Sequence, residues 1–130
     1  MPFRLVKLIS CVVGISNTVN KAVAVADRLA LEGITCDVID PRTTSPFDEE
    51  AIIESVETTG RLVIVDEMTP RCGLAADISS IIAEKAFGAL RAPIKKVTAA
   101  HSPIPFAPAL EDAWMPQEAD IEAAVREVLG

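Results

Sequence analysis

Four apolar runs of strand length alternate with helical or irregular segments, and this alternation restricts the possible folds more than any other feature of the chain. The runs are LVKLISCVV (residues 5–13), TCDVID (35–40), RLVIVDE (61–67) and PIKKVTA (93–99). Strands that alternate with helices pair through right-handed crossovers into a mainly parallel sheet. The chain is therefore predicted to adopt an α/β fold.

Four helices are predicted between and after these runs, because apolar residues there recur at helical spacing. Their expected boundaries are Asn17 or Thr18 and Gly33, Asp48 and Gly60, Gly73 and Phe87, and Pro116 before the last helix. The residues expected to face the core are Val19, Ala22, Val23, Ala26, Leu29, Ala30, Ile78, Ile81, Ile82, Ile121, Ala124, Val125 and Val128. Three of the four predicted helices thus have an apolar stripe to bury.

The composition favours a sheet covered on both faces. Half of the residues are hydrophobic but only 4% are aromatic, so the core must consist of aliphatic side chains. Parallel sheets between two helical layers have cores of this kind. With 130 residues, the chain is expected to form a single domain, residues 1–130, with three α/β/α layers and the strand order 2-1-3-4.

Charge and cysteine content exclude several classes of function. The net charge of −7 disfavours binding of duplex nucleic acid, which needs clustered basic residues, and suits a basic protein partner. Cys11, Cys36 and Cys72 are far apart and the chain has one histidine, so no metal site is predicted and a reduced cytoplasmic setting is expected. Arg4 and Lys7 before an apolar run give the start a weak likeness to a signal peptide, but no small-residue cleavage site follows. No run reaches the ~20 residues of a membrane span.

The strand order 2-1-3-4 predicts a crevice at the carboxyl ends of the first and third strands. There GISNT (14–18) would lie beside DEMTPRC (66–72). Neither segment has the glycine pattern of a phosphate-binding loop. Nucleotide binding therefore lacks its usual mechanism here.

Asp66 and Glu67 lie next to each other at the end of the third strand, so they would point to opposite faces and could not act together on one substrate atom. We expect one of them to cap the next turn or to form an ion pair, with Arg71 as a candidate partner. Cys72 precedes a helix, where a thiol can become reactive, but a small packed side chain is the expected role. His101 is expected to be a solvated loop residue, with contact to a partner as the alternative.

The segment HSPIPFAPALEDAWMP (101–116) contains Pro103, Pro105, Pro108 and Pro116. Because prolines lack the backbone donor, this segment is predicted to be a surface loop without regular structure. Its apolar residues are Ile104, Phe106, Trp114 and Met115. Trp114 and Met115 either fill the core of the domain or belong to an interface, and the sequence leaves both possibilities open.

Several of these segments together resemble a known family. The segment GITCDVIDPRTTSPFDEEAIIESVETTGRLVIVDE (33–67), the strand APIKKVT and the loop PIPFAPALE occur in the order found in the transketolase C-terminal domain. The form they resemble ends the β subunit of thiamine-dependent 2-oxo acid dehydrogenases. Pro70, Arg71, Cys72 and His101 make the chain most similar to the acetoin dehydrogenase β subunits.

This resemblance implies a role in assembly. In such enzymes thiamine diphosphate and magnesium are bound outside this domain, so no catalytic, cofactor-binding or metal residues are expected here. The implied partners are a second β subunit, the α subunit and a dihydrolipoyl acyltransferase. Asp66, Glu67, Arg71, Cys72, His101, Ile104, Phe106, Trp114 and Met115 then become candidate turn or interface residues. The chain is expected to be a fragment of a longer β subunit.

Two other classes of function stay open at this point. One is a small-molecule regulatory module that uses the predicted crevice near Asn17 and Asp66. The other is an independent enzyme in which Cys72 and His101 form a nucleophile pair. The substrate of the complete enzyme could be acetoin, pyruvate or a branched-chain 2-oxo acid, because the residues that would touch it are not in this chain.

Overall fold

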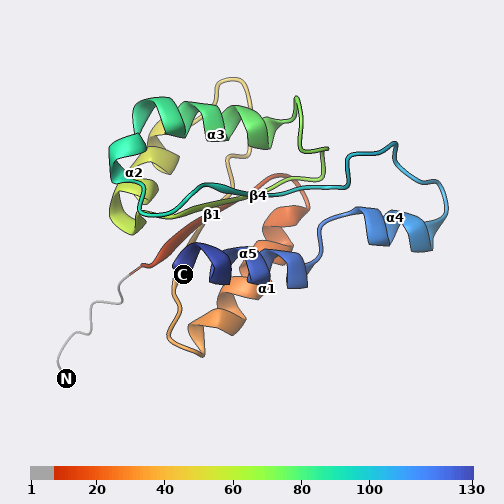
Figure 1. The fold of residues 1–130 in the computed structure, drawn as a ribbon, viewed down its shortest axis with the longest axis horizontal. Coiled ribbons are helices and arrows are strands. Elements are labelled where there is room, and N and C mark those ends of the chain that lie inside the picture. Colours follow the sequence, from red (N-terminus) through yellow and green to blue (C-terminus); the bar gives the residue numbers. More distant parts are fainter. Residues whose placement is uncertain (1–7) are drawn as a thin grey trace.

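The computed structural model describes residues 8–130, and Figure 1 shows their arrangement. The elements are β1 (Ser10–Gly14), α1 (Thr18–Ala30), β2 (Cys36–Ile39), α2 (Glu49–Thr59), β3 (Leu62–Val65), α3 (Leu74–Lys85), the 3-10 turn η1 (Phe87–Ala89), β4 (Lys95–Val97), α4 (Pro108–Trp114) and α5 (Glu118–Leu129). Arg4, Lys7 and the predicted strand residues 5–7 lie outside the described residues.

The four strands form one parallel sheet in the order β2-β1-β3-β4. In the centre of the sheet, Val12 lies opposite Val38 of β2 and Val63 of β3, and Val63 lies opposite Lys95 of β4. The predicted α/β fold and strand order are confirmed. Strands β2, β3 and β4 are each shorter than their apolar runs, because the ends of these runs turn into the connecting loops.

Helices cover both faces of the sheet, as Figure 1 shows. Successive strand residues point to opposite faces, so each strand contributes to two cores. Val12, Val63 and Val65 pack against α1 and α5. Cys11, Val13, Leu62 and Ile64 pack against α2 and α3. The three predicted α/β/α layers are therefore present.

The buried face of α1 differs from the predicted one. Its buried residues are Thr18, Ala22, Val25 and Leu29, whereas Val23 is 43% exposed. The predicted stripe begins at Val19 because Asn17 or Thr18 was the expected N-cap. The face actually begins one residue earlier, because the hydroxyl of Thr18 finds hydrogen-bond partners at the ends of β1 and β3.

The other helix boundaries follow the sequence signals closely. The Asp48 carboxylate accepts a hydrogen bond from Ala51 N at 3.2 Å and caps α2, which Gly60 ends in a left-handed conformation with φ 73°. The buried faces of α3 and α5 include predicted core residues: Ile78, Ile82, Ile121, Ala124, Val125 and Val128. Within residues 8–130, no helix is both long and apolar enough to cross a membrane.

The prediction that residues 101–116 lack regular structure is wrong in part. This segment contains α4, whose first residue is Pro108. Proline is tolerated at the first helical position, where its missing donor would have no partner within the helix and its fixed φ suits the helix. Ala109–Ala113 follow without another proline, so a short helix can form between Pro105 and Pro116.

Candidate functional site

The expected crevice between β1 and β3 is occupied by Thr18. Its hydroxyl oxygen lies 2.6 Å from the Ile15 carbonyl oxygen and 3.0 Å from the Val65 carbonyl oxygen, and it accepts a hydrogen bond from Ile15 N at 2.8 Å. Ile15 N also donates to Val65 O at 3.0 Å. The two strand ends are thus joined by a fully buried polar side chain.

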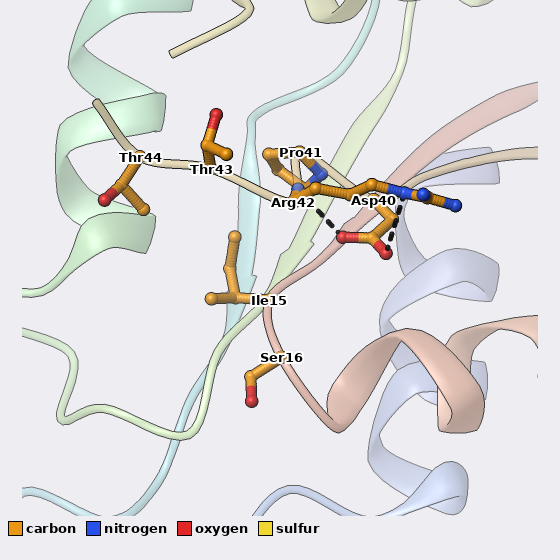
Figure 2. A pocket seen from close by; sticks show the side chains of 7 residues that line it. All are labelled: Ile15, Ser16, Asp40, Pro41, Arg42, Thr43 and Thr44. Atoms are coloured by element: carbon orange, nitrogen blue, oxygen red, sulfur yellow. Dashed lines mark hydrogen bonds and ion pairs between the residues drawn. The ribbon is translucent and has the colours of Figure 1, made fainter. Parts of the chain in front are cut away.

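A cavity opens next to this position, at the carboxyl ends of β1 and β2. Its volume is about 490 Å³, and Figure 2 shows the lining residues, which are Ile15, Ser16, Asp40, Pro41, Arg42, Thr43 and Thr44. Ser16 and Arg42 both have left-handed backbones, with φ of 58° and 61°. Non-glycine residues rarely adopt this conformation. The two loops that enclose the cavity are therefore tightly constrained.

Within the cavity lining, Asp40 and Arg42 interact with each other, as the dashed lines in Figure 2 show. Arg42 N donates to the Asp40 carboxylate at 3.0 Å, and the guanidinium Nε lies 3.9 Å from its second oxygen. The Arg42 side chain is 85% exposed. The cavity offers hydroxyl groups and one solvated ion pair, which suits hydrogen bonding to a small polar molecule and lacks the buried acid or base that catalysis uses.

Asp66 is almost completely buried and stabilises the turn after β3. One carboxylate oxygen accepts a hydrogen bond from Met68 N at 3.2 Å and the other accepts one from Ala75 N at 3.3 Å. Ala75 is in the first turn of α3, where donors lack partners within the helix. Asp66 therefore holds the start of α3 against the end of β3.

The rest of this turn has no arrangement suited to chemistry. Glu67 is half-buried, and Arg71 is exposed and takes part in no ion pair with Asp66 or Glu67. A Cβ at Gly73 would lie 3.1 Å from Met68 Cβ and from Thr69 O, so a larger residue would push against the turn where it passes close to itself. The residues of the turn itself therefore fill the space beside Gly73.

The expectation that Cys72 is packed is wrong, because its side chain is exposed. Its backbone has φ 57°, and the adjacent buried Gly73, not the thiol, packs against the turn. His101 is also exposed. No hydrogen bond joins Cys72 to His101 in the part of the chain that the structure describes, so the nucleophile pair required by an independent enzyme is not formed.

The two remaining cysteines lie in or against the core. Cys11 is fully buried, and burial raises the pKa of its thiol to about 12. Cys36 is half-buried, and burial raises its pKa as well. Both thiols stay protonated at neutral pH and act as small apolar side chains. Among residues 8–130 there is no group of three His, Cys, Asp or Glu side chains that could hold a metal ion.

The segment 100–116, here called the proline arm, projects from the carboxyl end of the sheet in Figure 1. Its base is closed by two hydrogen bonds, from Ala100 N to Trp114 O and from Trp114 Nε1 to Ser102 O, both at 3.2 Å. Trp114 and Met115 are half-buried there. They neither fill the core nor lie fully in solvent.

Beyond its base, the proline arm presents large apolar side chains to solvent. Phe106 is fully exposed, Ile104 is 61% exposed and Leu110 is 62% exposed. Ile104 and Phe106 are residues that sequence reasoning selected, whereas Leu110 was missed because α4 was not predicted. Apolar side chains grouped in this way on a projecting segment are typical of a protein interface.

Known proteins resemble this chain over most of its length. Residues 10–121 match the family described as "Transketolase, C-terminal domain". Acetoin:2,6-dichlorophenolindophenol oxidoreductase subunit beta is 50% identical over 111 residues in Cupriavidus necator and 47% identical over 116 residues in Bacillus subtilis. Pyruvate dehydrogenase E1 component subunit beta of Rickettsia felis is 44% identical over 117 residues.

These matches cover 85%, 89% and 90% of this chain but 33%, 34% and 36% of the relatives, so the chain spans about a third of their length. A solved structure, "Split gene transketolase, inactive beta4 tetramer", superposes with a TM-score of 0.79 and 27% sequence identity. That superposition covers 93% of this chain and 38% of the other. The fold and the sequence thus indicate the same family.

Proposed function

The chain belongs to the transketolase C-terminal domain family, and from this premise we propose that it is the assembly domain of a thiamine diphosphate-dependent acetoin or 2-oxo acid dehydrogenase β subunit. Because it spans about a third of its relatives, we place it within a longer subunit. The complete enzyme would cleave its substrate on the cofactor and transfer the product to lipoyl groups. We propose a cytoplasmic location for it.

The observation that carries this proposal is the proline arm with its fully exposed Phe106. Burial of a phenylalanine side chain in an interface is favourable, whereas the exposed side chain contributes no such stabilisation. We propose that the arm contributes to a contact between two β subunits. A two-fold contact is the form that identical chains most often use.

The other proposed partners are the α subunit and a dihydrolipoyl acyltransferase. The net charge of −7 supports a basic docking surface on one of these partners. Acetoin is our preferred substrate for the complete enzyme, because the relatives at 50% and 47% identity carry acetoin in their names, while the pyruvate dehydrogenase relative is 44% identical. A branched-chain 2-oxo acid is the remaining alternative.

The residues of this domain do not fit thiamine diphosphate and magnesium. The cavity in Figure 2 has no glycine-rich loop for a diphosphate, and its one carboxylate, Asp40, faces Arg42. We therefore assign the cofactor to other parts of the complete enzyme. Asp66 is engaged with two backbone amides, and among residues 8–130 no acid and base converge on one point.

The same cavity supports a second candidate function, a small-molecule regulatory module. Its volume of about 490 Å³ is within the range of small-ligand sites. Its hydroxyl groups and exposed ion pair would recognise a neutral polar molecule. We rank this function second because the lining is largely solvated.

We expect the 130-residue chain to bind no thiamine diphosphate and to turn over no acetoin. The physical reason is that it has neither a diphosphate cradle nor a carboxylate cluster for magnesium among residues 8–130. Titration calorimetry with the cofactor and magnesium at millimolar concentration should give no heat of binding. Saturable binding with a micromolar dissociation constant would contradict the assignment of a non-catalytic role.

A further inference from the structure

The cavity at the carboxyl ends of β1 and β2 combines an apolar wall with two charged groups. Ile15, which follows β1, is half-buried and packs partly against the core beneath α2 and α3. Pro41 lines the cavity from the loop that follows β2, and Asp40 and Arg42 of the same loop are its charged residues. Figure 2 shows the Ile15 side chain, the Asp40 carboxylate and the Arg42 guanidinium in this order across the view. A ligand in the cavity therefore meets an apolar surface and both signs of charge.

Both charged side chains retain free binding capacity. Arg42 Nε lies 3.9 Å from the Asp40 carboxylate, which is longer than the ~2.7–2.9 Å of a charge-assisted hydrogen bond. The two terminal nitrogens of the Arg42 guanidinium have no partner among residues 8–130. The side chains are 85% and 40% exposed, so their mutual attraction is weak in water and adds little to stability. A ligand that offers each charge a better partner can replace this contact at small cost.

The loop that carries the two charges is held in place by its own hydrogen bonds. The Asp40 carboxylate accepts a hydrogen bond from Arg42 N at 3.0 Å, which fixes the two residues beside each other. Further along the loop, Thr43 Oγ1 donates to Pro46 O at 2.7 Å. A ligand therefore meets a loop that is already ordered, and binding loses little conformational entropy in this loop.

The charges of the cavity narrow the class of ligand. An anion such as phosphate would face the Asp40 carboxylate, and a simple cation would face the Arg42 guanidinium. A molecule without charges would cover both groups without pairing them, which is unfavourable. A free α-amino acid carries an ammonium group for Asp40, a carboxylate that a guanidinium binds through two parallel hydrogen bonds, and a side chain for the apolar wall. The volume of about 490 Å³ is sufficient for a molecule of this size.

We infer that this cavity binds the zwitterion of an α-amino acid with an aliphatic side chain. The ligand carboxylate pairs with Arg42, its ammonium group pairs with Asp40, and its side chain packs against Ile15 and Pro41. This inference rests on the second candidate function, the small-molecule regulatory module, and names its ligand class. It is independent of the assembly role proposed for the domain. Because most of the lining is exposed, we expect a dissociation constant on the order of millimolar.

The test is an NMR titration of the isotope-labelled 130-residue chain with L-leucine and with two analogues that keep its apolar part. L-Leucinamide lacks the carboxylate, and isocaproate lacks the ammonium group. Leucine is expected to shift the backbone amide signals of Ile15, Ser16 and Arg42 in a saturable way. Each analogue is expected to bind at least about fivefold more weakly, because it leaves one charge of the cavity without a partner.

Two variants remove one charge of the cavity each. Asp40→Asn and Arg42→Gln are each expected to weaken leucine binding at least about fivefold, because a charge-assisted hydrogen bond is lost. Arg71→Gln is the matched control, since Arg71 is exposed and lies outside the cavity, and it should leave the affinity unchanged. Amide signals of the core that match those of the wild type show that a variant is folded.

Equal affinity for leucine and both analogues would overturn the inference, and so would wild-type affinity in the Asp40 and Arg42 variants. Shifts confined to residues outside the cavity, or no saturable shift at all, would overturn it as well. If glycerol then shifted the cavity residues in a saturable way while leucine did not, the small-molecule module would stand with a different ligand. The assembly role is tested separately by sedimentation, so its failure is distinguishable from the failure of this inference.

Discussion

Replacing Asp66 with alanine is expected to lower the free energy of unfolding by about 2–3 kcal/mol. Asp66 is 3% exposed and its two carboxylate oxygens accept hydrogen bonds from Met68 N and Ala75 N. Alanine would leave both amides without this acceptor, one of them in the first turn of α3. Urea denaturation followed by circular dichroism measures the loss, which should appear as a lower midpoint with an unchanged slope.

Glu67→Ala is the matched control for this substitution. Glu67 is the adjacent acid, it is half-buried, and its carboxylate has no hydrogen-bond or ion-pair partner within residues 8–130. Its replacement should change the free energy of unfolding by less than about 0.5 kcal/mol. Equal effects of the two substitutions, or no effect of Asp66→Ala, would contradict the structural role given to Asp66.

Replacing Ile64 with alanine is expected to destabilise the domain by about 3–4 kcal/mol. Ile64 is fully buried in β3, opposite Val13 of β1, and belongs to the core beneath α2 and α3. Truncation to alanine removes three methyl or methylene groups and leaves a space that the sheet, bordered by strands on both sides, cannot close by moving.

The loss should depend on burial and on the size of the truncation. Ile64→Val should cost about 1 kcal/mol, and Ile104→Ala on the exposed arm should cost less than about 0.5 kcal/mol in a monomeric sample. Denaturation at low protein concentration separates stability from association. A loss below about 1 kcal/mol for Ile64→Ala would mean that this face of the sheet is not the closely packed core described here.

The layers and the strand order could be predicted because they depend on patterns of apolar residues within short segments of the sequence. Apolar runs separated by helical stripes determine which elements exist, and capping residues such as Asp48 and Gly60 determine where they stop. The face of α1 was missed because burial of Thr18 depends on carbonyl groups contributed by two strands. The helix α4 was missed because Pro108 was taken as a breaker, whereas at the first helical position it is compatible with a helix.

The candidate surfaces were predictable only where one short segment forms them. Ile104 and Phe106 are two residues apart within a proline-rich segment, so the sequence alone indicated their exposure. A second hollow combines residues of α3, η1 and the approach to β4, and its shape exists only after these elements pack. It is lined by Ala83, Phe87, Leu90, Arg91, Ala92, Pro93 and Ile94. The exposure of Cys72 likewise depends on its left-handed backbone, for which a cysteine gives no local signal.

Self-association of the chain is the central claim of this account, and sedimentation equilibrium of the 130-residue chain over a wide concentration range tests it most directly. The account predicts a reversible monomer–dimer equilibrium whose dissociation constant rises when Phe106, the fully exposed residue of the proline arm, is replaced by serine. A strictly monomeric chain at the highest concentration, with the Phe106→Ser variant sedimenting identically, would contradict it.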